Sequence, residues 1–402
     1  MFKLYCRIYQ FMIRRVSRLL KWREPVILHS YLELVNTLKA QGKKRVLLVS
    51  DQGLAKLELY GDLVRNLERN AIDVVIYHGV TSNPTISHVE EALALYNAEG
   101  CEALIGFGGG SPLDVAKVVA AKLARPNKAI TKMKGILKIG KKTPLLIAVP
   151  TTSGTGSEAT LAAVIIDEKT RSKYAINDPV LFPSYALLLP ELTIALPKNI
   201  TAETGMDVLT HAVEAYIGKS NTKYTRAKAI NATRLVFEYL YTCYAEPGNL
   251  QARRMMQLAS YDAGAAFTRA YVGNIHALSH PLSAYYGLGH GKTNAIIMPI
   301  VLDEYGDKVY HSLASLARAA GISTEVNDEI AAKSFINLIK ELNRKMGIPE
   351  FIETIKDEDL TSLAHHAYKE ANPLYPVPVI FNEAKLVELY KKIRGDNHET
   401  TN

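Results

Sequence analysis

The sequence predicts two domains, an α/β N-terminal domain built on a parallel sheet and an all-α C-terminal domain. From Arg45 onward, short apolar runs alternate with segments of helical periodicity, which is typical of parallel βαβ units. Beyond Pro197 this β-rich pattern ends and long amphipathic stretches follow. At 402 residues, the chain is long enough for two domains that each bury a core of their own.

The composition is that of a globular protein. Hydrophobic residues make up 48% of the chain and charged residues 22%, which excludes the disordered and fibrous classes. Three cysteines, Cys6, Cys101 and Cys243, lie far apart and form no CxxC pair, so we expect neither a disulfide framework nor a cysteine zinc site. This cysteine usage fits a cytoplasmic location, where thiols stay reduced.

Residues 1–25 form a basic, amphipathic N-terminal extension. A helix here would have a polar stripe opposite an apolar face, but too many charges for a membrane span. The stripe consists of Lys3, Arg7, Gln10, Arg14, Ser17 and Lys21. Four hypotheses remain open: packing on the chain itself or an oligomer partner, contact with a membrane surface, a frayed terminus, or a targeting presequence.

The distribution of charge excludes a nucleic-acid binder. Residues 1–30 carry seven Lys or Arg side chains and one Glu, and so account for most of the net charge of +8. The rest of the chain is nearly neutral and shows no nucleic-acid-reading motif. We therefore predict no nucleic-acid partner.

We expect the α/β domain to span residues 26–197. Its predicted strands are RVLLVS, DVVIYH, ALIGF and PLLIAVP, and its predicted helices cover residues 54–67 and 89–98 and begin again at Ser111. In open parallel sheets, ligands bind beyond the carboxyl ends of the strands. Candidate binding residues are therefore those that follow each strand.

The strand ALIGF leads into GFGGGSPLDVAK, residues 106–117. Gly108, Gly109 and Gly110 place no β-carbon where the strand turns into a helix, and Ser111 before a proline favours a helix start. Backbone can therefore approach a pyrophosphate and direct helix N–H groups toward it. The alternative is a plain tight turn, since the motif is neither GxGxxG nor a P-loop. Its position after a strand favours a dinucleotide-binding sheet.

Two further strand ends carry polar residues. TTSGTGSEAT, residues 151–160, follows PLLIAVP and replaces an apolar run with hydroxyls and glycines. Asp51 ends the first strand, where a carboxylate can accept hydrogen bonds from the adenosine ribose and repel a 2′-phosphate. A polar turn and a surface aspartate are the alternatives. Asp51 in the binding role would favour NAD over NADP.

The second domain, residues 198–402, is predicted to be helical, with helices over residues 201–237, 250–269, 328–346 and 360–370. It also holds five candidate metal ligands. Asp207 and His211 lie four residues apart, as do His276 and His280, and His290 follows a glycine-bounded turn. Two or three imidazoles with one carboxylate suit Fe(II) or Zn(II). Spacing alone does not separate His276 from His280.

Four segments, in this order, make the chain resemble the iron-containing (group III) alcohol dehydrogenases: GGGSPLDVAK, PTTSGTGSEAT, GMDVLTHAVEAY and HALSHPLSAYYGLGHG. The resemblance covers roughly residues 40–395 and leaves out the basic extension. It implies this family's architecture, which dehydroquinate synthase shares.

The resemblance also implies roles for individual residues. The metal ligands would be Asp207, His211, His276 and His290, while His280 would lie near the nicotinamide and handle protons. The implied cofactor contacts are Gly108, Gly109, Gly110, Ser111 and Asp114 around the pyrophosphate, Thr151, Thr152 and Thr155 against the cofactor, Lys173 near its ribose, and Asp51 at the adenosine end.

The implied activity is hydride transfer between NAD(H) and a small primary alcohol or aldehyde, with Fe(II), or Zn(II) as the alternative, polarising the substrate oxygen. We expect a homodimer or a larger homo-oligomer. Three alternatives are a zinc polyol dehydrogenase of the glycerol type, a lyase related to dehydroquinate synthase, and a non-catalytic metal- and nucleotide-binding scaffold. The lyase needs a basic phosphate-binding cluster, and none is evident in residues 276–292.

Overall fold

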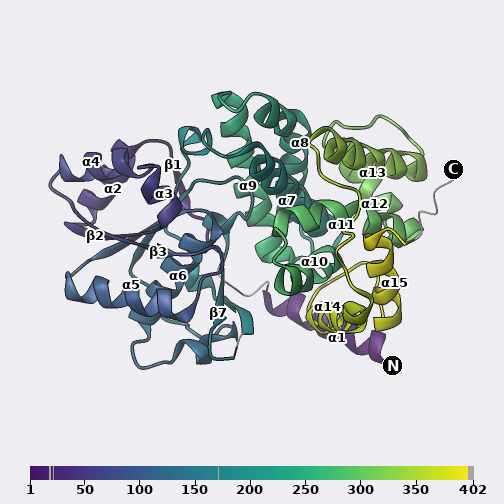
Figure 1. Cartoon of the computed structure of the whole chain (residues 1–402), viewed down its shortest axis with the longest axis horizontal. Helices are drawn as coiled ribbons and strands as arrows, with labels where there is room; N and C mark the ends of the chain where they lie inside the picture. The colour runs from purple at the N-terminus through teal and green to yellow at the C-terminus, as the bar shows by residue number, and fades with distance from the viewer. Residues whose placement is uncertain (18–19, 21, 171, 397–402) are drawn as a thin grey trace. The chain divides into compact units, whose positions relative to one another are not determined.

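The computed structural model describes residues 1–17, 20, 22–170 and 172–396. The chain divides into two compact units, one formed by Leu20–Ile194 and the other by Met1–Leu19 together with Ala195–Asn402 (Figure 1). The N-terminal helix α1 (Phe2–Ser17) therefore belongs to the same unit as the C-terminal half of the chain. Lys21, the last residue of the predicted polar stripe, lies outside the described residues.

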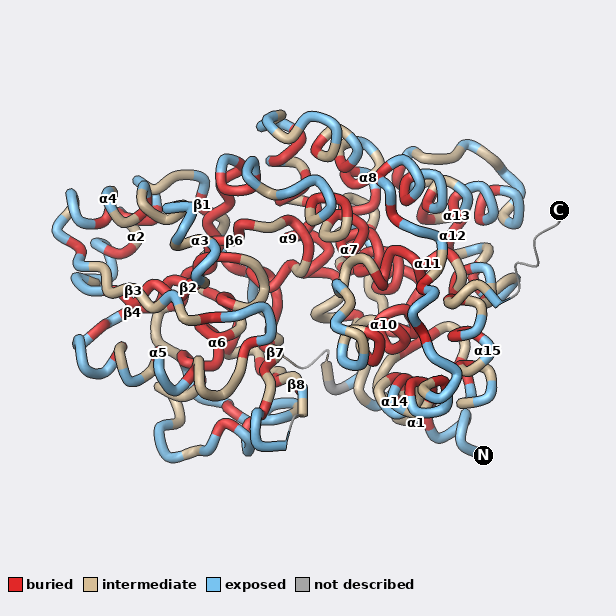
Figure 2. The backbone as a smooth tube through the Cα atoms, viewed as in Figure 1, coloured by how far each residue is buried: buried red, intermediate tan, exposed pale blue. Residues whose placement is uncertain are grey.

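The first unit contains a parallel sheet, which in the described residues has the strand order β1-β9-β6-β4-β2-β3. The strands are β1 (Val26–Leu28), β2 (Arg45–Asp51), β3 (Asp73–Val80), β4 (Ala103–Gly108), β6 (Leu145–Pro150) and β9 (Tyr185–Leu187). The central strands are buried along most of their length (Figure 2), because apolar layers cover both faces of the sheet. Within β2, Leu47 and Val49 enter one layer, and Val46 and Leu48 enter the other.

Helices and a small second sheet complete this unit. The helices are α2 (Tyr31–Ala40), α3 (Gln52–Lys56), α4 (Gly61–Glu68), α5 (Ile86–Ala98) and α6 (Gly110–Ala124). The second sheet holds β5 (Gly135–Ile136), β7 (Ala162–Asp167) and β8 (Ser172–Asn177). The single helix predicted over residues 54–67 is wrong, because the backbone at Glu58 takes a positive φ of 50° and ends the first helix.

The sheet order brings the three polar strand ends together. Strands β6, β4 and β2 are neighbours and run parallel, so their carboxyl ends lie at one edge of the sheet. A hydrogen bond from the Thr151 N–H to the Gly108 carbonyl, 3.0 Å long, joins the ends of β6 and β4. The residues that follow these three strands can therefore contact one ligand.

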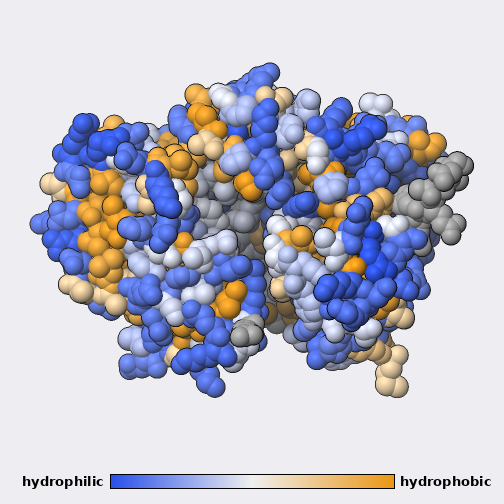
Figure 3. Space-filling view, in the orientation of Figure 1, coloured by the Kyte–Doolittle hydropathy of each residue, from blue (hydrophilic) through white to orange (hydrophobic). Residues whose placement is uncertain are grey.

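In its described residues the second unit consists of helices and connecting segments without a strand, as predicted. Its helices are α7 (Lys198–Ile217), α8 (Lys223–Ala245), α9 (Leu250–Ala270), α10 (Asn274–Tyr286), α11 (His290–Tyr305), α12 (Tyr310–Ala319), α13 (Asp328–Lys345), α14 (Leu360–Ala371) and α15 (Glu383–Arg394), besides α1. Apolar side chains from nearly all of them form one continuous core. Hydrophilic side chains cover much of the face seen in Figure 3.

One predicted helix, over residues 201–237, is two helices in the structure. Gly218 ends α7 in an extended conformation, and the Asn221 side chain donates to the carbonyls of Tyr216 and Gly218 at 2.7 Å each. Thr222 then starts α8 by accepting a hydrogen bond from the Thr225 N–H. The polar residues of GKSNT therefore form a turn, which the helical periodicity did not indicate.

None of the helices in the described ranges combines the length and the apolar character needed to cross a bilayer.

Candidate metal centre and cofactor loops

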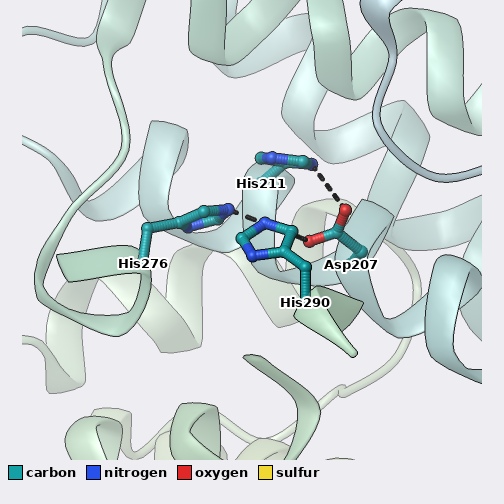
Figure 4. Close-up of side chains that lie close together, drawn as sticks. All are labelled: Asp207, His211, His276 and His290. Carbon is teal, nitrogen blue, oxygen red and sulfur yellow. Dashed lines mark ion pairs between the residues drawn. The ribbon is translucent and has the colours of Figure 1, made fainter. Parts of the chain in front are cut away.

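Three helices of the second unit bring together the four side chains predicted as metal ligands. Asp207 and His211 come from α7, His276 from α10, and His290 from the first residue of α11 (Figure 4). The potential ligand atoms of these residues all lie within 4.8 Å of one another. The spacing of four residues places Asp207 and His211 on one face of α7, toward the other two helices.

The distances suit a single ion. Asp207 Oδ1 lies 3.8 Å from His276 Nε2 and 3.5 Å from His290 Nε2, and Asp207 Oδ2 lies 4.0 Å from His211 Nδ1. Ligand atoms about 2.1 Å from a tetrahedral ion stand about 3.4 Å apart, which is close to these separations. Three imidazoles and one carboxylate also form the mixed nitrogen and oxygen set that Fe(II) and Zn(II) accept. The residues therefore fit a divalent transition metal.

Burial prepares these groups to bind a cation. Burial lowers the pKa of His276 well below its ordinary value, so its imidazole is neutral at pH 7, as a ligand must be. Burial alone would raise the pKa of Asp207, but His211, His290 and an N–H of Asn294 outweigh it, and the pKa lies below its ordinary value. The His290 side chain is 34% exposed, so one side of the cluster remains accessible.

A buried carboxylate, Glu214 on α7, holds His276 in place. Glu214 accepts hydrogen bonds from His276 Nδ1 at 2.6 Å and from the N–H groups of Gly273 and Ile275 at 2.8 Å each. A bond through Nδ1 leaves Nε2 of His276 directed at Asp207. A β-carbon at Gly273 would lie 2.7 Å from the Glu214 carboxylate, so only glycine fits there. Burial raises the pKa of Glu214 to about 8, and a cation at the adjacent site would lower it.

Asn294, one turn into α11, lies among the candidate ligands. Its amide nitrogen lies 2.8 Å from Asp207 Oδ1, 3.1 Å from His290 Nε2 and 3.2 Å from His276 Nε2. Two amide hydrogens cannot serve three acceptors at once, and the bond to Asp207 is the shortest. An ion bound by both imidazole nitrogens would leave Asn294 to orient the Asp207 carboxylate.

His280, the fifth candidate, lies beside the cluster and faces a different carboxylate. Its Nδ1 lies 2.5 Å from Oε1 of Glu370 on α14, and the Tyr375 hydroxyl donates to the same oxygen at 2.9 Å. The His280 ring stacks on His290 with centroids 5.0 Å apart. His280 is not part of the group whose ligand atoms converge. The structure thus separates His280 from His276, which spacing could not do.

The glycine loop of the first unit has the form of a phosphate cradle. Gly108 has a φ of +145°, and a β-carbon there would lie 2.7 Å from Pro112. β-Carbons at Gly109 and Gly110 would point at the Thr152 and Thr155 side chains, with closest approaches of 3.5 and 3.1 Å. Helix α6 begins here with no side-chain cap and no acidic residue in its first turn, so its N–H groups are available to an anion. These features fit the pyrophosphate of a dinucleotide.

Two other residues predicted to contact the cofactor, Ser111 and Asp114, make hydrogen bonds within the protein. Ser111 donates to the Ser82 carbonyl at 3.0 Å. Asp114 accepts from the Ser157 hydroxyl at 2.8 Å and from the Val164 N–H at 2.9 Å, and burial raises the pKa of its carboxyl. The Asp114 carboxylate is thus directed at the loop after β6 and at β7.

The remaining predicted contacts lie in the same unit. Thr151 is buried at the end of β6, and Thr155 accepts from the Ser157 N–H at 3.3 Å. Lys173 is exposed on β8, and its charge offsets a small part of the rise that burial causes in the pKa of Asp114. Asp51 caps α3 by accepting from the Leu54 N–H at 2.9 Å, at the same sheet edge as the glycine loop.

Four residues that contact the predicted site residues were not themselves predicted. Glu214 and Asn294 follow His211 and His290 at spacings of three and four, so helical periodicity could have indicated both. Lys117 lies in the quoted motif GGGSPLDVAK; its buried ammonium donates to the hydroxyls of Ser157 and Thr160, and burial lowers its pKa to about 8. Glu370 lies 90 positions from His280, and no sequence signal joins the two.

Both halves of the chain match a known protein family. Residues 28–190 match the family described as iron-containing alcohol dehydrogenase, and residues 201–394 match the C-terminal domain of Fe-containing alcohol dehydrogenases. The NAD-dependent methanol dehydrogenase of Bacillus methanolicus is 33% identical over 347 residues, which cover 84% of this chain and 89% of that protein.

Two solved structures are similar in fold. A 1,3-propanediol oxidoreductase superposes with a TM-score of 0.89 at 33% identity, over 93% of this chain and 99% of that one. The sulfoacetaldehyde reductase of Bifidobacterium kashiwanohense, solved in complex with NAD+, gives a TM-score of 0.83 at 28% identity, over 93% and 98% of the two chains.

The contacts of Glu214 lead to a prediction about metal affinity. Glu214→Gln removes the negative charge that Glu214 acquires behind His276 when a bound cation lowers its pKa, so the dissociation constant for Fe(II) or Zn(II) should rise about 10- to 100-fold. Anaerobic calorimetric titration of the metal-free protein measures it. Glu238→Gln, the same change at an exposed position of α8, is the control and should leave the constant unchanged. Equal affinity of the two variants would mean that Glu214 has no influence on the metal.

Proposed function

Since the chain belongs to the iron-containing alcohol dehydrogenase family, we propose that Asp207, His211, His276 and His290 hold its metal ion. The enzyme is an NAD-dependent oxidoreductase that transfers a hydride between NAD(H) and an alcohol or the corresponding aldehyde, with iron as the family's metal. The single observation that carries the proposal is the convergence of the four ligand atoms within 4.8 Å.

We propose a small primary alcohol or its aldehyde as the substrate. The names of two similar proteins, a methanol dehydrogenase and a 1,3-propanediol oxidoreductase, both point to short primary alcohols. The lyase and scaffold alternatives find no comparable support. A cytoplasmic location remains part of the proposal, supported by the buried free thiols of Cys6, Cys101 and Cys243. A homodimer or larger homo-oligomer also remains part of the proposal.

In this proposal the cofactor loops bind NAD and exclude NADP. Gly108, Gly109 and Gly110 let the backbone approach the pyrophosphate, with Ser111 in the first turn of α6 and Asp114 just beyond it. Thr151, Thr152 and Thr155 line the neighbouring strand end, and Lys173 and Asp51 serve the riboses. Lys117 and Asp114 fix the loop after β6 through Ser157, which holds the threonines against the glycines.

Alcohol oxidation releases a hydride and a proton, and the protein must manage the proton. When bound, the metal would supply Lewis acidity to the substrate oxygen, and NAD(H) would exchange the hydride. His280 is the proposed catalytic base, with Nε2 as the atom that accepts the hydroxyl proton. Glu370 accepts the Nδ1 hydrogen, which fixes the tautomer in which Nε2 carries the lone pair and stabilises the imidazolium that forms.

The direct test of this function is metal-dependent turnover. NADH oxidation with short-chain aldehydes by anaerobically purified enzyme should cease after chelation, because the substrate oxygen is no longer polarised. It should return when Fe(II) is restored, and Zn(II) in parallel identifies the metal. Absence of turnover in enzyme that demonstrably holds metal and NADH would reject the activity.

The position of Asp51 predicts cofactor selection. Asp51→Asn keeps an oxygen that caps α3 but removes the charge that would face a 2′-phosphate. The NADH-to-NADPH ratio of kcat/KM should fall at least tenfold, because like charges about 4 Å apart near a surface repel by roughly 4 kcal/mol. Steady-state kinetics with both cofactors measures it, and an unchanged ratio would remove Asp51 from the adenosine site.

The His280–Glu370 pair predicts a loss of turnover. Glu370→Gln should lower kcat about tenfold or more, raise the solvent isotope effect, and leave KM for NADH unchanged, because it disturbs the tautomer of His280 and not cofactor binding. Glu383→Gln is a matched control, since Glu383 contacts His365 Nδ1 at 2.9 Å in the same way. A kcat for Glu370→Gln equal to that of the control would exclude the pair from proton transfer.

A further inference from the structure

Helix α1 packs on the chain through its polar face. Arg7 donates to the carbonyls of Val377 and Pro378 at 2.7 and 2.9 Å. Gln10 donates to the Tyr375 carbonyl at 2.7 Å and is only 5% exposed. An amphipathic helix on a globular core ordinarily buries its apolar stripe. Here the orientation is the reverse.

The acceptor segment explains this orientation. It connects α14 to α15 and reads NPLYPVPVIF, residues 372–381, an irregular stretch whose prolines have no N–H and whose carbonyls need donors from elsewhere. Arg7 and Gln10 supply these donors. Cys6, which is fully buried, packs against Val377 and Ile380. Polar contacts therefore fix the rotation of α1, and its other face is left to solvent.

That outer face is a row of large apolar side chains. Its members and their exposed fractions are Phe2 (43%), whose ring also stacks on Tyr368 of α14, Leu4 (65%), Tyr5 (54%), Ile8 (56%), Phe11 (52%) and Met12 (56%). Hydrophobic groups show along the lower right edge of Figure 3, where Figure 1 places α1. Contiguous apolar surface of this kind marks a site of interaction. We call these six residues the outer face of α1.

The charged side chains of α1 are all positive. Lys3 and Arg15 are exposed on α1, and the Arg15 guanidinium lies 4.9 Å from the centroid of the Phe11 ring. The helix contains no acidic residue. Apolar and aromatic side chains flanked by cations match the interface of a membrane with anionic headgroups, where acyl chains receive the apolar groups and phosphates the cations.

A second copy of the chain fits the outer face less well. Two α1 helices packed face to face would bury the Arg15 charge of each copy in the contact, and α1 has no carboxylate to compensate it. We propose that the outer face of α1 docks the enzyme on an anionic lipid surface, with the helix lying in the membrane plane and Lys3 and Arg15 at the headgroups. This goes beyond the catalytic proposal, and α1 lies outside both matched ranges.

The test is flotation of the full-length enzyme with vesicles of phosphatidylcholine alone or mixed with phosphatidylserine. Partitioning to the mixed vesicles should be stronger and should fall with salt. Ile8→Asp should lower it tenfold or more, because it removes an inserted apolar side chain, and Lys3→Gln or Arg15→Gln about fivefold each. Ile330→Asp, the same exchange at a residue of α13 that is 53% exposed, should change nothing.

The proposal is wrong if the wild type does not float with the mixed vesicles, or if Ile8→Asp and Ile330→Asp float equally. If lipid binding is absent and Ile8→Asp instead dissociates an assembly measured by light scattering, the face belongs to a contact with a second copy. Aldehyde reduction by Ile8→Asp should equal that of the wild type, so failure here is distinct from failure of the catalytic proposal.

Discussion

The helical unit is organised around the hydrogen bond between buried Glu214 and His276. A carboxylate this deeply buried is costly unless donors surround it, and Glu214 has the His276 ring and two backbone N–H groups at the start of α10. The same contacts fix the position of α10 against α7 and the direction in which the His276 ring presents Nε2. Gly273 is required because any side chain would collide with the carboxylate. One buried acid thus determines both the packing of two helices and the orientation of a ligand.

Two histidines four residues apart have different surroundings because each faces its own carboxylate. Glu214 orients His276 toward Asp207, while Glu370 holds His280 at the side of the cluster, against His290. The difference is also one of solvent access, since His276 is 2% exposed and the His280 side chain 39%. A buried neutral imidazole suits a ligand, and an accessible imidazole paired with a carboxylate suits proton exchange. Helix α10 can therefore present both functions on neighbouring turns.

In the α/β unit, the order of the strands positions the candidate cofactor-binding residues. Because β2, β4 and β6 are parallel neighbours, Asp51, the glycine loop and the threonine loop lie at one edge. Lys117 and Asp114 then connect the start of α6 to the loop after β6 through Ser157. The orientation of helix α1, in the helical unit, is set by hydrogen bonds. Its polar side chains donate to carbonyls of a proline-rich segment, and its apolar face points outward.

Much of this could be predicted from the sequence. Periodicity indicated the α/β and helical halves, and the ordered motifs indicated the family, because strand ends and helix faces are local properties of the chain. The break between α7 and α8 escaped because a polar turn inside a periodic stretch gives little local signal. The partner of His280 and the rotation of α1 depend on contacts between segments 90 and more than 360 positions apart. The local order of residues sets which side chains are available for chemistry. Which carboxylate each histidine faces follows only from the packing of helices that are distant in the sequence.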